Sequence, residues 1–244
     1  MSEKNQQLLD KLQARFAENL LNVSHANGEV TIEVGSDTYH DVCKVLRDSN
    51  DFKFEQLIDL CGVDYSQYGV EEWATTETSS TGFSRGVEGG SSGRLTFGDE
   101  LESGCDDSRR FAVVLHLMSY ENNQRLRVRT YADQSAFPVV PSLTDVWSAA
   151  DWYEREAFDL YGILFEGHHD LRRLLTDYGF VGHPFRKDFP LVGNVEMRYD
   201  PAKGRVVYEP VTIEPRVLVP KVVREDNRYV DQTSDDIGQE ASQS

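Results

Sequence analysis

The sequence is poor in cysteine. Its 244 residues contain three, at Cys43, Cys61 and Cys105. Because their number is odd, their spacing is wide and no C-x-x-C pair occurs, the sequence predicts neither a disulfide framework nor an iron–sulfur site. We expect Cys43 and Cys61 to be small core residues.

Long apolar runs are also missing. No stretch approaches the about 20 apolar residues that a transmembrane helix needs. The residues Met1–Asp10 are polar, unlike the charged-then-apolar pattern of a signal sequence. We therefore expect the protein to stay in the cytoplasm and to reach a membrane only through partners. With 39% hydrophobic residues, the chain can bury one core with appendages.

Proline is absent from the first half of the chain, since all eight prolines lie from Pro138 onward. Regular structure can therefore run uninterrupted before Pro138, whereas the last part should be extended and rich in turns.

Positive charge is scarce, and the net charge is −17. The segment Glu71–Ser108 contains nine acidic residues and two arginines, and the segment Glu225–Ser244 contains six acidic residues and one arginine. Neither segment has an apolar period, so the charge indicates solvated chain and disfavours binding to nucleic acid or an anionic membrane. We expect a flexible insertion at 73–107 and a disordered tail at 225–244.

Three stretches have helical periodicity. Apolar residues recur every four positions from Leu8 to Leu20, which predicts a first helix over that range, and Tyr39–Leu46 predicts a second. Ser142 and Asp145 have the spacing of a capping box, so a third helix should start after Pro141 and end at Gly162.

The remaining regular segments predict strands. These are Glu29–Val34, Phe52–Leu60 with a turn at Cys61–Tyr65, Arg110–Met118 and Arg125–Tyr131. The last alternates arginines with apolar residues, which is typical of an antiparallel strand with one solvated face. The predicted fold class is α+β: helices packed on a mainly antiparallel sheet over residues 1–165, followed by a long extended C-terminal segment over 166–224, with a hairpin turn at Pro201–Gly204.

The most specific signal lies between Glu154 and Pro190. Three blocks read E-R-E-x-x-D-x-x-G from Glu154, G-H-x-x-L-R-R-L-L-T-D-Y-G-F from Gly167, and G-H-P-x-R-K-D-F-P from Gly182. The stretch resembles the family of C subunits, the 30 kDa-type subunits, of respiratory NADH:quinone oxidoreductase (respiratory complex I), with lesser agreement at Cys61–Tyr65. The departures are the insertion at 73–107 and His169, where members of the family often carry proline.

The resemblance implies a cofactor-free structural subunit of the peripheral arm of a proton-pumping complex, on the cytoplasmic side of the inner membrane. It implies docking to the D subunit, which carries the quinone site, and to other peripheral-arm subunits, in support of electron transfer from NADH to quinone. The alternative is the equivalent subunit of a membrane-bound hydrogenase or formate-hydrogenlyase complex.

The residues themselves also predict an interface. We call Gly167–Pro190 the motif segment; it has too few periodic apolar residues to bury itself and therefore needs a second surface. Its arginines offer charged forks for partner carboxylates and its phenylalanines offer anchors. The predicted interface residues are Glu154, Arg155, Asp159, Arg172, Arg173, Asp177, Tyr178, His183, Arg186, Lys187 and Asp188. The first three should also make ion pairs or hydrogen bonds inside the domain.

Two other chemistries compete for these residues. His168, His169, Asp170 and His183 have side chains that suit zinc or iron. Against a metal-dependent enzyme, adjacent histidines should point in different directions, and no H-E-x-x-H occurs. Glu154 and Glu156 resemble an acid/base pair, but two positions on a helix face nearly opposite ways.

A phosphate site is disfavoured as well. The glycine-rich run Gly86–Gly90 is acidic and is followed by neither a lysine nor a helix, so it would repel a phosphate.

Overall fold

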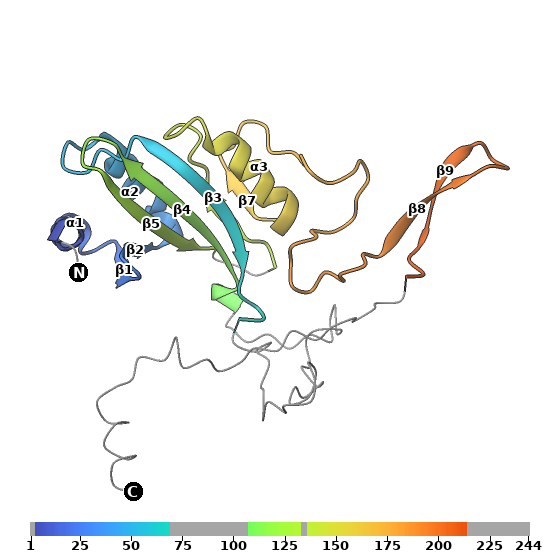
Figure 1. The fold of residues 1–244 in the computed structure, drawn as a ribbon, viewed down its shortest axis with the longest axis horizontal. Helices are drawn as coiled ribbons and strands as arrows, with labels where there is room; N and C mark the ends of the chain where they lie inside the picture. Colours follow the sequence, from blue (N-terminus) through green and yellow to red (C-terminus); the bar gives the residue numbers. More distant parts are fainter. Residues whose placement is uncertain (1–2, 69–106, 133–135, 214–244) are drawn as a thin grey trace, which may run out of the picture.

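The body of the molecule is a five-stranded sheet with helices packed on one face (Figure 1). The computed structural model describes residues 3–68, 107–132 and 136–213. The strands of this sheet are β1 (Leu20–Ala26), β2 (Glu29–Val34), β3 (Gln56–Asp64), β4 (Phe111–Ser119) and β5 (Gln124–Tyr131). Their order is β1-β2-β5-β4-β3, and β2–β5 is the one parallel pair in this sheet. The predicted α+β class with a mainly antiparallel sheet is confirmed.

One face of the sheet forms the core because strand side chains alternate. Val113, Leu115 and Leu117 of β4 are buried on this face. Two amphipathic helices, α1 (Glu3–Phe16) and α2 (Ser36–Asp48), contribute their apolar stripes to the same core.

Helix α3 (Ala150–Tyr161) packs beside the edge strand β3. The hydroxyl of Tyr153 donates a hydrogen bond to the carbonyl of Ile58, at 2.9 Å. The ring of Tyr161 packs directly on Gly62, where an added Cβ would lie 2.7 Å from Cδ2 of the ring. Before and after α3, β6 (Val139–Pro141) and β7 (Leu164–Glu166) pair in parallel, which was not predicted.

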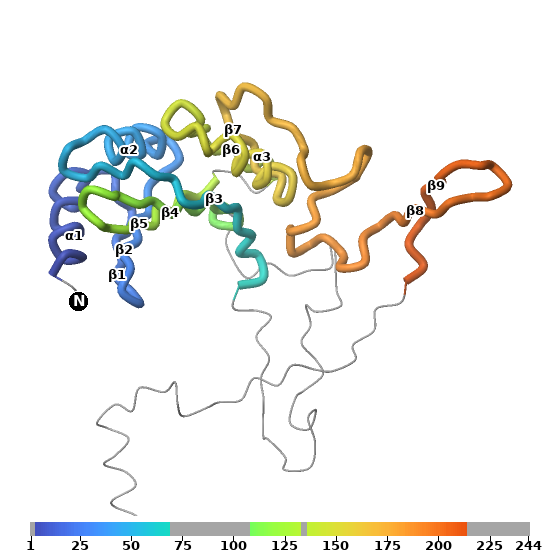
Figure 2. The backbone as a smooth tube through the Cα atoms, turned by 45° about the horizontal axis from the view of Figure 1, so that its top comes forward, coloured from blue at the N-terminus to red at the C-terminus, as the bar shows by residue number. Residues whose placement is uncertain are grey.

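The chain then leaves the body. After the motif segment come β8 (Val195–Asp200) and β9 (Arg205–Pro210), an antiparallel hairpin. Figures 1 and 2 both show this hairpin projecting away from the sheet and helices. The hairpin turn predicted at Pro201–Gly204 is confirmed. The division into a core and a partner-binding segment stays a prediction, and the predicted insertion, up to residue 106, and tail lie outside the described residues.

The predicted first helix was too long. Helix α1 ends at Phe16, and Leu20 begins strand β1. The amide of Asn19 closes a turn by donating to the carbonyl of Phe16, at 2.7 Å. Strand β1 was missed because it is an edge strand with no buried residue, so its sequence lacks a clear alternation of apolar and polar residues.

The predicted second strand was displaced. Strand β3 begins at Gln56 and runs through the predicted turn as far as Asp64. Phe52 and Phe54 are buried although they precede the strand, and the amide of Phe54 donates to the carbonyl of Leu46 at 3.0 Å. Phe52 and Phe54 are therefore buried loop residues, and their apolar character led to the wrong prediction that the strand begins at Phe52.

The predicted start of the third helix was also wrong, although its end at Gly162 is confirmed by a left-handed φ of 73°. Residues 142–149 form turns, and α3 begins at Ala150. The hydroxyl of Ser142 donates to the carboxylate of Glu154 and does not cap a helix N-terminus, so the predicted capping box is not formed.

Within the described part of the chain, none of the helices combines the length and apolarity that crossing a membrane requires.

We expect Gly62→Ala to lower the free energy of unfolding by about 1 to 3 kcal/mol, because the new methyl group must displace the ring of Tyr161. Urea unfolding of the isolated chain measures this. Gly35→Ala is the matched control, since its methyl group meets the movable carboxylate of Asp37. Equal stability of the two variants would contradict the close packing of α3 on β3.

Candidate functional site

The motif segment is attached to the carboxyl end of α3. The last carbonyls of a helix have no partner inside the helix. Three successive carbonyls here are met by the motif segment: the oxygens of Asp159, Leu160 and Tyr161 face His183 Nδ1, Phe185 N and Arg186 Nε at 2.9, 3.0 and 2.6 Å. The helix end and the segment therefore satisfy each other's polar groups.

The side chain of Asp159 holds a second part of the segment. It is fully buried, and its Oδ2 accepts hydrogen bonds from three consecutive amides, those of Leu174, Leu175 and Thr176, at 3.0, 2.7 and 2.9 Å. Its Oδ1 accepts from the Thr176 hydroxyl at 2.6 Å and lies 3.3 Å from Arg173. Burial alone would raise the pKa of Asp159, but the bonds from Thr176 and the neighbouring amides outweigh it and lower the pKa.

A third attachment joins the segment to the end of β3. Asp64 Oδ2 accepts from the amide of Lys187 at 2.9 Å, and the same carboxylate binds Arg110 at 3.3 Å. Arg110 also pairs with Asp188 at 2.7 Å. Burial opposes ionisation of Asp64, yet the bonds from Lys187, Ser66 and Arg110 prevail and lower its pKa.

The pKa of Glu154 is shifted in the opposite direction, upward. Its side chain is fully buried, where it accepts from the hydroxyl of Ser142 and the amide of Leu143, both at 2.6 Å. Burial raises the pKa of Glu154 to about 7 because these two bonds only partly offset the loss of hydration. Glu156 is exposed on the other side of α3, so the two carboxylates share no site.

The histidines adjoin α3 in an unexpected way. The rings of His168 and His169 stack with centroids 5.1 Å apart, so the prediction that they point in different directions was wrong. Together with Asp151 they bring three potential ligand atoms within 4.8 Å of one another.

Hydrogen bonding nevertheless disfavours a metal at this cluster. Nδ1 of His168 accepts from the amide of Asp170 at 3.0 Å, so the proton of the neutral ring resides on Nε2, which faces the carbonyl of Asp151 at 3.2 Å. Asp151 is also paired with Arg155, at 2.9 Å. A metal would have to break these bonds, so the cluster fits a hydrogen-bonded turn.

The predicted interface residues fall into three classes: buried, half-buried and exposed. Glu154, Arg155 and Asp159 are buried and make their bonds within the chain, while Arg173 and His183 are half-buried against the end of α3. Arg172, Asp177, Tyr178 and Lys187 are exposed, and Arg186 and Asp188 are half-buried. No residue of the motif segment is buried, and its exposed large hydrophobic side chains are Leu175, Tyr178, Val181 and Phe185.

Three functional residues escaped sequence reasoning. Asp64 appeared only as part of a turn, and nothing local marks Arg110 or Ser142 as a partner of residues far along the chain. The resemblance at Cys61–Tyr65 was the one sequence signal for Asp64.

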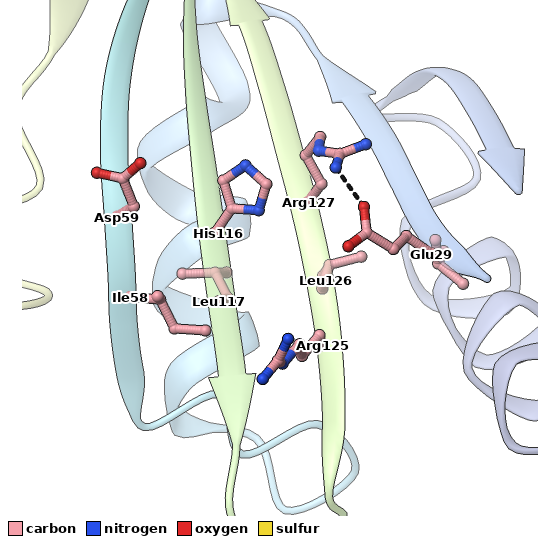
Figure 3. Close-up of a pocket in the computed structure, with 9 residues that line it drawn as sticks. Glu29, Ile58, Asp59, His116, Leu117, Arg125, Leu126 and Arg127 are labelled. Atoms are coloured by element: carbon pink, nitrogen blue, oxygen red, sulfur yellow. Dashed lines mark hydrogen bonds and ion pairs between the residues drawn. The ribbon is translucent and has the colours of Figure 1, made fainter. Parts of the chain in front are cut away.

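The outer face of the sheet carries a shallow hollow of about 310 Å³ (Figure 3). Asp59, His116 and Arg127 lie in one row across β3, β4 and β5. Arg127 pairs with Glu29 of β2. Opposite charges paired across strands are typical of a solvated sheet face, in agreement with the solvated face predicted for Arg125–Tyr131.

We expect Asp159→Asn to free the motif segment from α3. Removing a buried charge that has several donors should cost about 3 to 5 kcal/mol of unfolding free energy. Hydrogen exchange should show lost protection at the amides of Leu174, Leu175 and Thr176. Asp177→Asn, at an exposed acid of the same segment, is the control. Unchanged protection in the first variant would contradict the attachment.

We expect Glu154→Gln to remove a pH dependence. The folded-state pKa of about 7 lies above the ordinary value of 4.5, so the folded chain binds this proton more tightly and loses stability as pH rises between them. The variant should therefore gain about 2 to 3 kcal/mol relative to the unchanged chain between about pH 5 and about pH 8. Urea unfolding at several pH values measures the difference, and a constant difference would contradict the assignment.

Comparisons with known proteins agree with the motif blocks. The family model described as "Respiratory-chain NADH dehydrogenase, 30 Kd subunit" matches residues 92–195. Two proteins named as the C subunit of NADH-quinone oxidoreductase, from Xanthomonas campestris pv. campestris (strain B100) and Xylella fastidiosa (strain 9a5c), are 57% and 55% identical over 238 residues. In each case the match covers 94% of this chain and 94% of the relative.

Among solved structures, a chain of the membrane-bound sulfane sulfur reductase, an archaeal respiratory membrane complex, has a TM-score of 0.51 at 20% identity. The match covers 78% of this chain and 88% of that one, and at such identity it shows a shared fold alone. The extensive identity to the two bacterial proteins confirms the resemblance. The chain therefore belongs to the family of 30 kDa subunits of the respiratory-chain NADH dehydrogenase, the C subunits of NADH-quinone oxidoreductase.

Proposed function

We propose that this chain is a cofactor-free structural subunit of the peripheral arm of a proton-pumping NADH:quinone oxidoreductase. In this role it docks the D subunit, which carries the quinone site, and contacts other peripheral-arm subunits. It supports electron transfer from NADH to quinone by fixing the positions of those subunits. It lies on the cytoplasmic side of the inner membrane and contacts the membrane only through them.

The observation that carries the proposal is a rigidly attached segment with an uncovered surface. Its backbone is held at α3 and at β3, yet four of its large hydrophobic side chains stay exposed, Tyr178 completely so. The neighbouring hairpin adds Val195, Met197, Tyr199, Val206 and Tyr208 to the exposed hydrophobic side chains. An apolar surface on a fixed framework favours a protein interface over a flexible linker.

The buried acids near this surface support a structural role. Asp159 and Asp64 hold backbone amides, and Glu154 bonds to Ser142 and Leu143. Their positions fit the shaping of a docking surface. Iron or flavin bound to the purified chain, or quinone reduction by the chain alone, would contradict the proposal.

The alternative is the equivalent subunit of a membrane-bound hydrogenase or formate-hydrogenlyase complex. The names of the relatives with 55% and 57% identity favour the NADH-quinone oxidoreductase. Capture of the full chain from its own cells, followed by identification of the companions, separates the two. NADH-binding and quinone-site subunits support the proposal, whereas nickel-site subunits support the alternative.

We expect Tyr178→Ala to weaken association with the companion subunits by about 2 kcal/mol or more, as for a central aromatic residue of an interface. The melting temperature of the isolated chain should not change, because the side chain is fully exposed. Tyr120→Ala, at an exposed tyrosine beyond the end of β4, is the matched control. Equal recovery of companions with both variants would contradict docking through the motif segment.

A further inference from the structure

Arg186 differs from the other arginines of the motif segment. Arg173 is paired with Asp159, and Arg172 is exposed beside Asp170. Arg186 is half-buried, and among the described residues no carboxylate forms an ion pair with it. The nearest acids are already engaged, since Arg110 binds both Asp64 and Asp188.

The guanidinium of Arg186 is nevertheless held in place. Its Nε donates to the carbonyl of Tyr161 at 2.6 Å, and its Cζ lies 4.9 Å from the centre of the Phe111 ring. It rests against the backbone of Gly162, where a Cβ would lie 2.5 Å from Nη2. Nη1 and Nη2 thus remain as a fixed fork, the geometry that binds a carboxylate through two parallel hydrogen bonds.

This fork lines an open hollow of about 440 Å³, which we call the Arg186 hollow. His183 also lines it, with Nδ1 turned to the carbonyl of Asp159, so Nε2 is left as an acceptor. Phe189, Asn194 and Asp188 form another part of the wall, and the carboxylate of Asp188 is paired with Arg110 at 2.7 Å. The hollow has room for an acidic side chain.

A second hollow of about 430 Å³ adjoins the first, because Phe189 and Asn194 line both. We call it the Phe180 hollow; Val181, Val195, Met197 and Tyr208 also line it. Gly182, with φ +101°, lies beside the ring of Phe189, where a Cβ would be 2.7 Å from Cε2. The turn at Gly182 therefore allows the Phe189 ring to stand between the two hollows.

We propose that one segment of a companion subunit occupies both hollows, with an Asp or Glu carboxylate on the fork of Arg186 and an apolar side chain in the Phe180 hollow. This inference rests on the proposed function and names the chemistry of the partner. The two hollows adjoin each other. One is apolar, and the other holds the Arg186 guanidinium beside Asp188, whose carboxylate is paired with Arg110 rather than with Arg186. A polypeptide segment supplies both an apolar group and a carboxylate, whereas a free anion supplies only the charge.

Arg186→Lys tests the contact directly in the intact complex. The variant keeps the positive charge and places a primary amine in the Arg186 hollow. Treatment with a water-soluble carbodiimide activates carboxylates, which form an amide with an amine in contact. Peptide mapping should find a new link from position 186 to an Asp or Glu of a companion subunit. The unchanged chain is the control, because a guanidinium does not react and any link from Lys187 appears there too.

Links from position 186 only to Asp64 or Asp188 of the same chain, or no link, would overturn the inference while companions still co-purify. Failure of the unchanged chain to capture any companion would instead overturn the proposed function, and this inference with it. The two failures are therefore distinguishable.

Arg186→Gln measures the strength of the contact. Loss of one member of a desolvated charged pair should weaken recovery of the companions about tenfold or more. Arg15→Gln removes the same charge from an exposed position on α1 and should leave recovery unchanged. Equal recovery with the two variants would overturn the inference.

Discussion

The carboxyl end of α3 is the constraint on which the rest of the C-terminal structure depends. A helix end leaves unpaired carbonyls, and the motif segment supplies donors to three of them. In return, the Asp159 side chain in the same last turn accepts three amides from the segment. A segment without helix or strand thereby acquires a fixed course. The segment is positioned by its hydrogen bonds to α3, which in turn packs against strand β3 of the sheet.

Buried acids act in two different electrostatic states around this helix. Asp159 and Asp64 receive enough donors to remain ionised despite burial. Glu154, with two donors, has a pKa raised to about 7. The difference follows from the number of hydrogen bonds, since all three side chains are removed from water. The number of nearby hydrogen-bond donors thus distinguishes Asp159 and Asp64, which bind backbone amides as carboxylates, from Glu154, whose pKa lies near neutrality.

Sequence reasoning anticipated the fold class, the presence of three helices and the hairpin turn, although two of the helices had wrong bounds, because apolar periodicity and turn residues are local signals. It failed where the cause was distant. The spacing of Ser142 and Asp145 predicted a helix cap, whereas the hydroxyl of Ser142 in fact bonds to Glu154, twelve residues further along the chain. A local pattern does not reveal such a distant partner. Strand β1 was missed because an edge strand needs little buried surface. The motif blocks identified the family, but Asp159 as the anchor of residues 174–176 and Arg110 as the partner of Asp64 depend on contacts that no local pattern encodes.

In the proposed docking, the attachment of the motif segment also couples folding to assembly. Its course requires α3, the end of β3 and Arg110, the residue before β4, to be in place together. An unfolded chain therefore cannot present Tyr178, Phe185 and Arg186 in their proper relation. A companion that recognises this arrangement selects folded chains and draws the folding equilibrium towards them by mass action. In the proposed docking, a chain whose sheet and helices are misfolded would not present this surface and would not be bound.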